Sequence, residues 1–209
     1  MKLAIFGATG GTGQHLVRQA LERGHQVTTL VRSPSKLGVS SEQLRVVQGE
    51  LSQADKVAKA VQGAEAVISA LGPVENKPTF TVSQGTGHIL EAMKEHEVER
   101  LVISAGAGVS DPKDEPKLAN RLINFLLKSI SRWVYEDMLR TVQLVRQSEL
   151  NWTVVRVPRL TDEQPSGTVK FTYVGKGMGF KISRADLART MLDLAESGEY
   201  LKQAPAVSN

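Results

Sequence analysis

Short apolar runs alternate along the whole chain with stretches that are apolar on one side only. The runs are typical of buried strands, and the one-sided stretches have the periodicity of amphipathic helices. Strands are predicted at 3–6, 26–31, 44–48, 65–70, 100–104, 152–157 and 168–174, with at most one edge strand in the tail from 202. Helices are predicted at 14–23, 52–61 (with Ser52 as N-cap), 79–96, 117–148 in two pieces, and from 183 (with Ser183 as N-cap). This alternation predicts a doubly wound, parallel α/β sheet of the Rossmann type with a small appended C-terminal region.

The first predicted strand and helix are joined by a glycine-rich segment, Gly7-Ala8-Thr9-Gly10-Gly11-Thr12-Gly13. Strand, glycine-rich turn and helix in this order are typical of the opening unit of a dinucleotide-binding fold. Gly7 allows a tight turn, Gly10 a close approach of a pyrophosphate, and Gly13 close packing of helix on strand. Free N–H groups at the helix start, where Gly11 lies, are expected to hold phosphates, and Thr9 and Thr12 add hydroxyl donors. The alternative is a purely structural glycine turn.

The end of the second strand indicates which coenzyme is preferred. NAD-binding sites usually place an acid there to hold the ribose 2′-hydroxyl, but this chain has Arg32 and Ser33, followed by Lys36. A guanidinium, a hydroxyl and an ammonium suit a 2′-phosphate. NADP(H) is therefore predicted over NAD(H), with a solvated loop as the alternative.

The carboxyl ends of the other strands supply the remaining candidate cofactor residues, because ligands bind at these ends in open α/β sheets. The set consists of Glu50, Leu51, Ala70, Leu71, Gly72 and Ser104. Ser104, at the end of the fifth predicted strand, is expected near the nicotinamide.

The length and composition favour an ordinary globular domain over disulfide-rich, nucleic-acid-binding and membrane proteins. The chain has 209 residues, 41% apolar and 23% charged, which suits a single domain over 1–209 whose substrate side comes from about 106–135 and 158–182. It has no cysteine, which excludes disulfides and thiolate chemistry. The net charge of +4 comes without a basic run, so nucleic-acid binding is not expected. No apolar run reaches membrane-span length, and Met1-Lys2 leads directly into a strand, so a cytoplasmic protein with no membrane role is expected.

Several of these segments together resemble the atypical short-chain dehydrogenases/reductases, in their NAD(P)H-binding, NmrA-like group. They are 7–13, Val31-Arg32, Leu71-Gly72, Ser104-Ala105, 152–158 and 182–188. Within the group, the chain is most similar to the flavin reductase, or biliverdin reductase B, branch. The resemblance implies an NADPH-dependent reductase that passes hydride to a flavin, a bilin or a quinone, with the flavin as substrate rather than bound group. It also implies that the candidate cofactor residues, together with Pro158, line the coenzyme. Two positions depart from that branch, which has histidine where this chain has Met138 and Arg159.

The usual acid–base pair of short-chain dehydrogenases, Tyr-x-x-x-Lys, is missing. Tyr135 lies at a suitable distance after Ser104, but Leu139 stands four residues later, and Tyr173 and Tyr200 lack the lysine as well. A lysine there would lower the tyrosine pKa, so ordinary alcohol chemistry is not expected. Tyr135 is a candidate acid or a packed aromatic. Reduction of a flavin demands only proximity and orientation, for which Ser104 is the candidate.

Two functions from different classes fit this sequence. One is the reductase with a small planar acceptor, for which Arg159 is a candidate substrate contact or a rim residue in an ion pair. The other is a non-catalytic NADP(H)-binding sensor of the NmrA type. The apolar stretch at 118–130 would be a packed helix, a wall of the substrate pocket or a dimer contact, and the protein is expected to be a monomer or homodimer. A sugar-nucleotide epimerase or dehydratase is excluded, because the chain lacks both the Tyr–Lys pair and a sizeable substrate domain. The four histidines form no ligand set, so no metal is predicted.

Overall fold

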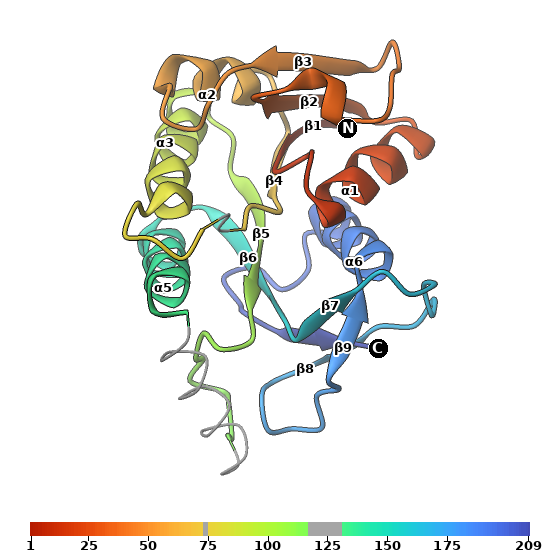
Figure 1. Cartoon of the computed structure of the whole chain (residues 1–209), viewed down its shortest axis with the longest axis vertical. Helices are drawn as coiled ribbons and strands as arrows, with labels where there is room; N and C mark the ends of the chain where they lie inside the picture. The colour runs from red at the N-terminus through yellow and green to blue at the C-terminus, as the bar shows by residue number, and fades with distance from the viewer. Residues whose placement is uncertain (73–74, 117–130) are drawn as a thin grey trace.

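The computed structural model describes residues 1–72, 75–116 and 131–209 (Figure 1). The predicted helical stretch at 118–130 lies outside these residues. The first half of the chain contains β1 (Lys2–Phe6), α1 (Gly11–Glu22), β2 (Gln26–Val31), η1 (Pro34–Lys36), β3 (Leu44–Gln48), α2 (Ala54–Val61), β4 (Ala66–Ser69) and α3 (Thr81–Glu95). The second half contains β5 (Arg100–Gly106), α5 (Arg132–Gln147), β6 (Asn151–Val157), β7 (Arg159–Thr161), β8 (Lys170–Thr172), β9 (Lys181–Ser183), α6 (Arg184–Ser197) and β10 (Ala206–Ser208).

The main sheet has eight strands in the order β3-β2-β1-β4-β5-β6-β10-β8. Every neighbouring pair is parallel except β10 with β8. The chain runs outward from β1 to β3 and then returns to add β4 on the other side, so the order reverses between β1 and β4. Open α/β sheets bind their ligands in the crevice at such a reversal, outside the carboxyl ends of the strands. The predicted Rossmann-type sheet is confirmed.

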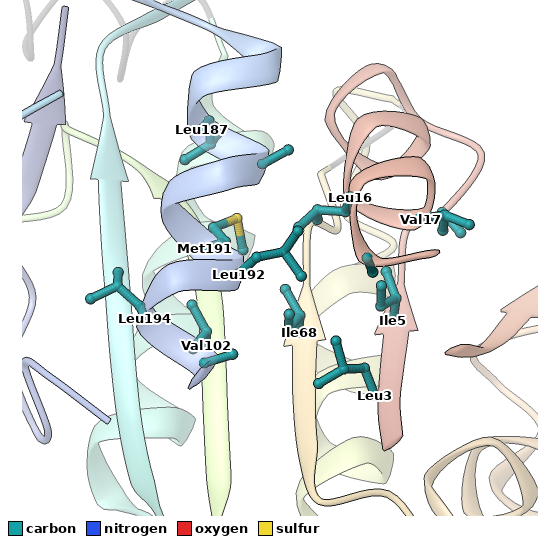
Figure 2. Packing of buried hydrophobic residues seen from close by; sticks show 14 of the residues in the cluster. Leu3, Ile5, Leu16, Val17, Ile68, Val102, Leu187, Met191, Leu192 and Leu194 are labelled. Carbon is teal, nitrogen blue, oxygen red and sulfur yellow. The ribbon is translucent and has the colours of Figure 1, made fainter. Parts of the chain in front are cut away.

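Helices cover both faces of the sheet. Helices α1 and α6 lie side by side on one face, and α2, α3 and α5 lie on the other (Figure 1). On the first face, Leu16 of α1 and Leu192 of α6 pack over Ile5 and Ile68 of the central strands (Figure 2). Alternate residues of β1 point to the opposite core, as Ala4 and Phe6 do. Burial on both faces explains why the central strands are continuous apolar runs.

The structure corrects three details of the predicted elements. Helix α2 begins at Ala54 after an N-cap at Gln53 that makes no side-chain cap, so Ser52 is not the N-cap. Strand β8 covers only Lys170–Thr172, because the amide of Val174 leaves the sheet and donates to the carboxylate of Asp114 at 2.9 Å. The tail strand β10 lies between β6 and β8 rather than at an edge, because β8 pairs with its outer side.

A second, two-stranded sheet pairs β7 with β9 in parallel, at the lower right of the view in Figure 1. It joins the end of β6 to the start of α6, so the region after Pro158 is attached to the main sheet at both of its ends. The N-cap predicted for α6 is confirmed, since the Ser183 hydroxyl accepts from the amide of Asp186 at 3.0 Å. Among the described residues, no helix is both long and apolar enough to cross a membrane.

Candidate dinucleotide and acceptor site

The glycine-rich turn is packed against the backbone that follows β4. Gly7 has a φ of +81°, and a Cβ added there would lie 2.7 Å from the carbonyl oxygen of Ala70. A Cβ on Gly13 would lie 2.0 Å from the carbonyl oxygen of Gly7. Gly10 is exposed, and its amide donates to the Gly7 carbonyl at 2.9 Å. Two of the three glycines are therefore required by backbone packing, and the third leaves an open surface at the tip of the turn.

Helix α1 begins inside this segment, at Gly11, with Gly10 as its N-cap. The N-cap makes no side-chain hydrogen bond, and the first turn contains no acid. Amide groups in the first turn of a helix have no partner within the helix, and the helix dipole favours an anion near them. The predicted phosphate-binding residues of the turn are thus brought together at one helix start, in a form that suits the pyrophosphate of a dinucleotide.

The basic residues after β2 lie beside the same turn. The side-chain amide of Gln14 donates to the carbonyl of Thr9 at 3.4 Å and to the carbonyl of Lys36 at 3.3 Å, which joins the turn to η1. Arg32 and Lys36 are exposed and Ser33 is half-buried. The chain thus has two cations and a hydroxyl next to the glycine turn, where a ribose 2′-phosphate would suit them.

The predicted adenine-side residues follow β3. Glu50 is exposed and Leu51 is half-buried. The Leu51 side chain packs on Gly85 of α3, where an added Cβ would lie 2.8 Å from it, and the Leu51 carbonyl lies 2.7 Å from Nδ1 of His88. After β4, Leu71 is half-buried and Gly72 is exposed, so this strand end also presents an open surface.

Ser104 is placed differently from the prediction. Strand β5 does not end there but continues to Gly106, because Ala105 and Gly106 extend the ladder with Arg156 and Val157 of β6. Ser104 is half-buried within β5, opposite Val155. Pro158 follows the end of the neighbouring strand, so these two candidates come from adjacent strands of the sheet.

Helix α5 covers the residues that follow β5. The Tyr135 hydroxyl donates to the carbonyl of Gly108 at 3.4 Å. The sulfur of Met138 accepts from the amide of Gly106 at 3.1 Å. The position at which the flavin reductase branch has a histidine is therefore a thioether packed on the end of β5.

The starts of α3 and α5 are both capped by side chains from elsewhere in the chain, which sequence reasoning missed. The buried carboxylate of Asp137 in α5 accepts from the amides of Val82 and Ser83 in the first turn of α3, at 3.1 and 2.9 Å. The side-chain oxygen of Asn76, which precedes α3, accepts from the amides of Trp133 and Val134 in α5, at 3.1 and 3.4 Å. Neither residue lies at the N-terminus of the helix that it caps, so a local capping pattern could not have revealed them.

Arg159 lies at the start of β7 with an exposed side chain. Its amide donates to the carbonyl of Phe180 at 3.3 Å, and Phe180 is 87% exposed. An aromatic residue so exposed was not among the predicted site residues. The signal available in the sequence is its place directly after the glycine-rich loop at 175–179.

A buried ion pair joins the loop after β5 to strand β6. The fully buried guanidinium of Arg156 donates to both oxygens of Asp114, at 2.7 and 2.8 Å, and to the carbonyls of Val109 and Ala204. Burial raises the pKa of Asp114, but the hydrogen bonds from Arg156 and from backbone amides outweigh it and leave the pKa below its usual value. This pair fixes the loop after β5 to the strand before Pro158.

A second buried carboxylate organises the loop before β8. Asp186 in α6 accepts from the amides of Ser166 and Gly167, at 2.8 and 3.3 Å, and from the side chain of Asn209 at 3.0 Å. Burial raises its pKa, but these hydrogen bonds, that of Ser183 and the charge of Arg189 leave the pKa lowered. The loop, the start of α6 and β10 are therefore tied to one carboxylate.

Comparisons with known proteins agree with this geometry. Residues 7–197 match the family model described as NAD(P)H-binding. The chain is 26% identical to the oxidoreductase aflX of Aspergillus parasiticus over 93% of this chain and 77% of that protein, and it spans less than two thirds of the next two relatives it matches.

Two solved structures share the fold. One is a short-chain dehydrogenase/reductase of Veillonella parvula in complex with NADP, with a TM-score of 0.81 and 17% identity, covering all of this chain and 94% of that one. The other is ChuY of Escherichia coli O157:H7, described as an anaerobilin reductase, with a TM-score of 0.81 and 18% identity, covering all of this chain and 97% of that one. The family match covers most of the chain, so the chain belongs to the NAD(P)H-binding family.

Proposed function

We propose that the protein is an NADPH-dependent reductase of a small planar acceptor such as a flavin, a bilin or a quinone. The observation that carries the proposal is the joining of the glycine turn to the basic residues after β2 through the side chain of Gln14. The site offers amides for a pyrophosphate and cations for a 2′-phosphate, without an acid at the end of β2.

The chain's own residues would bind and orient the coenzyme rather than exchange protons with the acceptor. When bound, NADPH supplies the hydride, and solvent can supply the proton. Leu139 stands where a lysine would activate Tyr135, and the Tyr135 hydroxyl is directed to a backbone carbonyl. Ser104 and Pro158 would border the nicotinamide, and Ser104 would orient it or an acceptor carbonyl by a hydrogen bond. Proximity and orientation then supply the rate.

The acceptor side favours a planar, anionic molecule. Phe180 offers an exposed aromatic face, and Arg159 is its hydrogen-bonded backbone neighbour. Aromatic rings stack on planar conjugated molecules, and a guanidinium binds carboxylates and phosphates. Flavin mononucleotide, bilins and anionic quinones combine both properties. The likeness to a structure described as an anaerobilin reductase is consistent with this class of acceptor.

The test is NADPH oxidation at 340 nm with the purified protein and a panel of flavin mononucleotide, riboflavin, a bilin and small quinones, with Ser104→Ala beside the wild type. Saturable turnover of one acceptor is expected, with a lower kcat in the variant and a similar affinity for NADPH. Tight NADPH binding without turnover of any acceptor would favour the NADP(H)-binding sensor instead.

The coenzyme preference is tested separately by Arg32→Asp. Removal of the cation and addition of an acid is expected to weaken NADPH by about tenfold or more and to leave NADH unchanged or tighter. Binding of both coenzymes is measured by titration calorimetry. Equal wild-type affinities for NADPH and NADH would contradict the proposed preference.

A further inference from the structure

Arg184, the first residue of α6, lies directly on the glycine turn. A Cβ added to Gly11 would be 2.7 Å from both Cδ and Nε of Arg184 and 3.6 Å from its Cζ. Residue 11 must therefore lack a side chain for the arginine to lie there. The contact joins the first turn of α1 to the first turn of α6, which are far apart in sequence but adjacent in the fold (Figure 1).

A cation in this place is electrostatically unfavourable in the free protein. Arg184 is the first residue of α6 and rests on the first residue of α1, so it lies at the positive ends of two helix dipoles. The first turn of α1 has no acid. The acid in the first turn of α6, Asp186, is directed to the loop at Ser166 and Gly167. The N-termini of α1 and α6 and the guanidinium of Arg184 thus lie together at the glycine turn.

One exposed acid offsets part of this charge. Nη1 of Arg184 donates to Asp162 at 2.8 Å, and the Asp162 side chain is 82% exposed while that of Arg184 is 27% exposed. A guanidinium has five N–H donors in a fixed fork, so donors remain for a second acceptor. The ion pair with Asp162 holds the Arg184 side chain against the glycine turn, beside the start of α1.

We propose that Arg184 binds the pyrophosphate of the dinucleotide, with Asp162 as its positioning residue. The inference rests on the proposed function in that it takes the glycine turn as the phosphate site. Arginine bonds to phosphate are short and charge-assisted, and they are stronger than neutral ones. Arg32 would recognise the 2′-phosphate, which only NADPH has, whereas Arg184 would recognise the pyrophosphate, which NADPH and NADH share.

The experiment measures dissociation constants of NADPH and NADH by titration calorimetry for the wild type and Arg184→Met. Methionine keeps an unbranched apolar stem but removes the charge. Both coenzymes are expected to weaken by about tenfold, to a similar factor. The melting temperature of the free variant should be unchanged or higher, because a cation is removed from two positive helix ends. The difference from the wild type should shrink in molar salt.

The control is Arg23→Met, at the other end of α1. Arg23 also forms ion pairs, with Asp193 at 2.8 Å and Glu196 at 2.9 Å, so the substitution removes a comparable charge away from the turn. Its affinity for both coenzymes should match the wild type. Arg184→Lys, which keeps the charge but not the fork, should bind both with intermediate affinity.

The outcomes separate this inference from the proposed function. Unchanged binding by Arg184→Met overturns the inference, and so does a loss confined to NADPH, which would assign Arg184 to the 2′-phosphate. A wild type that binds neither coenzyme overturns both proposals. A matched loss for both coenzymes supports the inference even if no acceptor is turned over.

Discussion

The two sides of the site are built in different ways. On the coenzyme side, the glycine turn is shaped by backbone packing, with Gly7 against Ala70 and Gly13 against Gly7. On the side proposed for the acceptor, the loops are held by buried side chains, with Arg156 bound to Asp114 and Asp186 bound to the loop at Ser166. The glycine turn has no room for an added side-chain atom, whereas the loops depend on each buried charge keeping its partner.

The largest expected loss of stability comes from a substitution in the ion pair on the side proposed for the acceptor. Asp114→Ala leaves the fully buried guanidinium of Arg156 without its carboxylate. Removal of one partner of a buried ion pair costs about 3–5 kcal/mol of unfolding free energy. Urea denaturation measures the loss, and NADPH affinity below the melting transition should stay within about threefold of the wild type. A loss below about 1 kcal/mol would mean that solvent reaches the pair.

The next largest loss of stability is expected from a substitution in the glycine turn on the coenzyme side. Gly13→Ala places a Cβ 2.0 Å from the Gly7 carbonyl oxygen, so the turn must shift. Overpacking of this kind costs about 1–3 kcal/mol of unfolding free energy, and NADPH affinity should fall by about tenfold or more. The matched control is Gly87→Ala, also within a helix, where an added Cβ meets nothing within 4 Å. That variant should be as stable as the wild type or up to about 1 kcal/mol more stable. Equal behaviour of the two variants would show that the turn adapts.

Low pH should destabilise the loops held by Asp114 and Asp186, because it protonates their carboxylates. The pKa values of Asp114 and Asp186 are lowered in the folded state, so both stabilise the fold above the unfolded-state pKa of about 3.9. This stability is lost as the pH falls below that value through the folded-state pKa values. Urea midpoints measured from about pH 5 down to about pH 3 should therefore fall. Asp114→Asn should give a shallower fall than the wild type, and parallel curves would contradict this.

The smallest expected changes in unfolding free energy come from substitutions of two serines, Ser183 and Ser52. Ser183→Ala removes a cap that accepts from Asp186 and should cost about 1 kcal/mol of unfolding free energy. Ser52→Ala should change it by less than about 0.5 kcal/mol, because α2 begins after Ser52 with a different N-cap. Thermal unfolding of both variants gives the comparison. A larger loss for Ser52→Ala would restore it as a cap.

Prediction from the sequence was successful where the determinants are local. The turn at 7–13, the parallel strands and the cap at Ser183 each follow from residues close together in the chain. The length of β5 was underestimated, because Gly106 pairs with Val157, which lies about fifty residues later. The contact of Arg184 with Gly11 and the exposure of Phe180 could not be predicted, because they depend on how distant segments pack. The roles of Ser104, Tyr135 and Arg159 in the reaction remain proposals for experiment.

The capping of α3 and α5 by distant side chains has a consequence for local opening. Fraying of α3 breaks its hydrogen bonds to Asp137 of α5, and fraying of α5 breaks its hydrogen bond to Asn76 in the segment before α3. The two helix starts should thus behave as one cooperative unit. In native-state hydrogen exchange, the amides of Ser83 and Trp133 should share one opening free energy, although a long stretch of chain separates them.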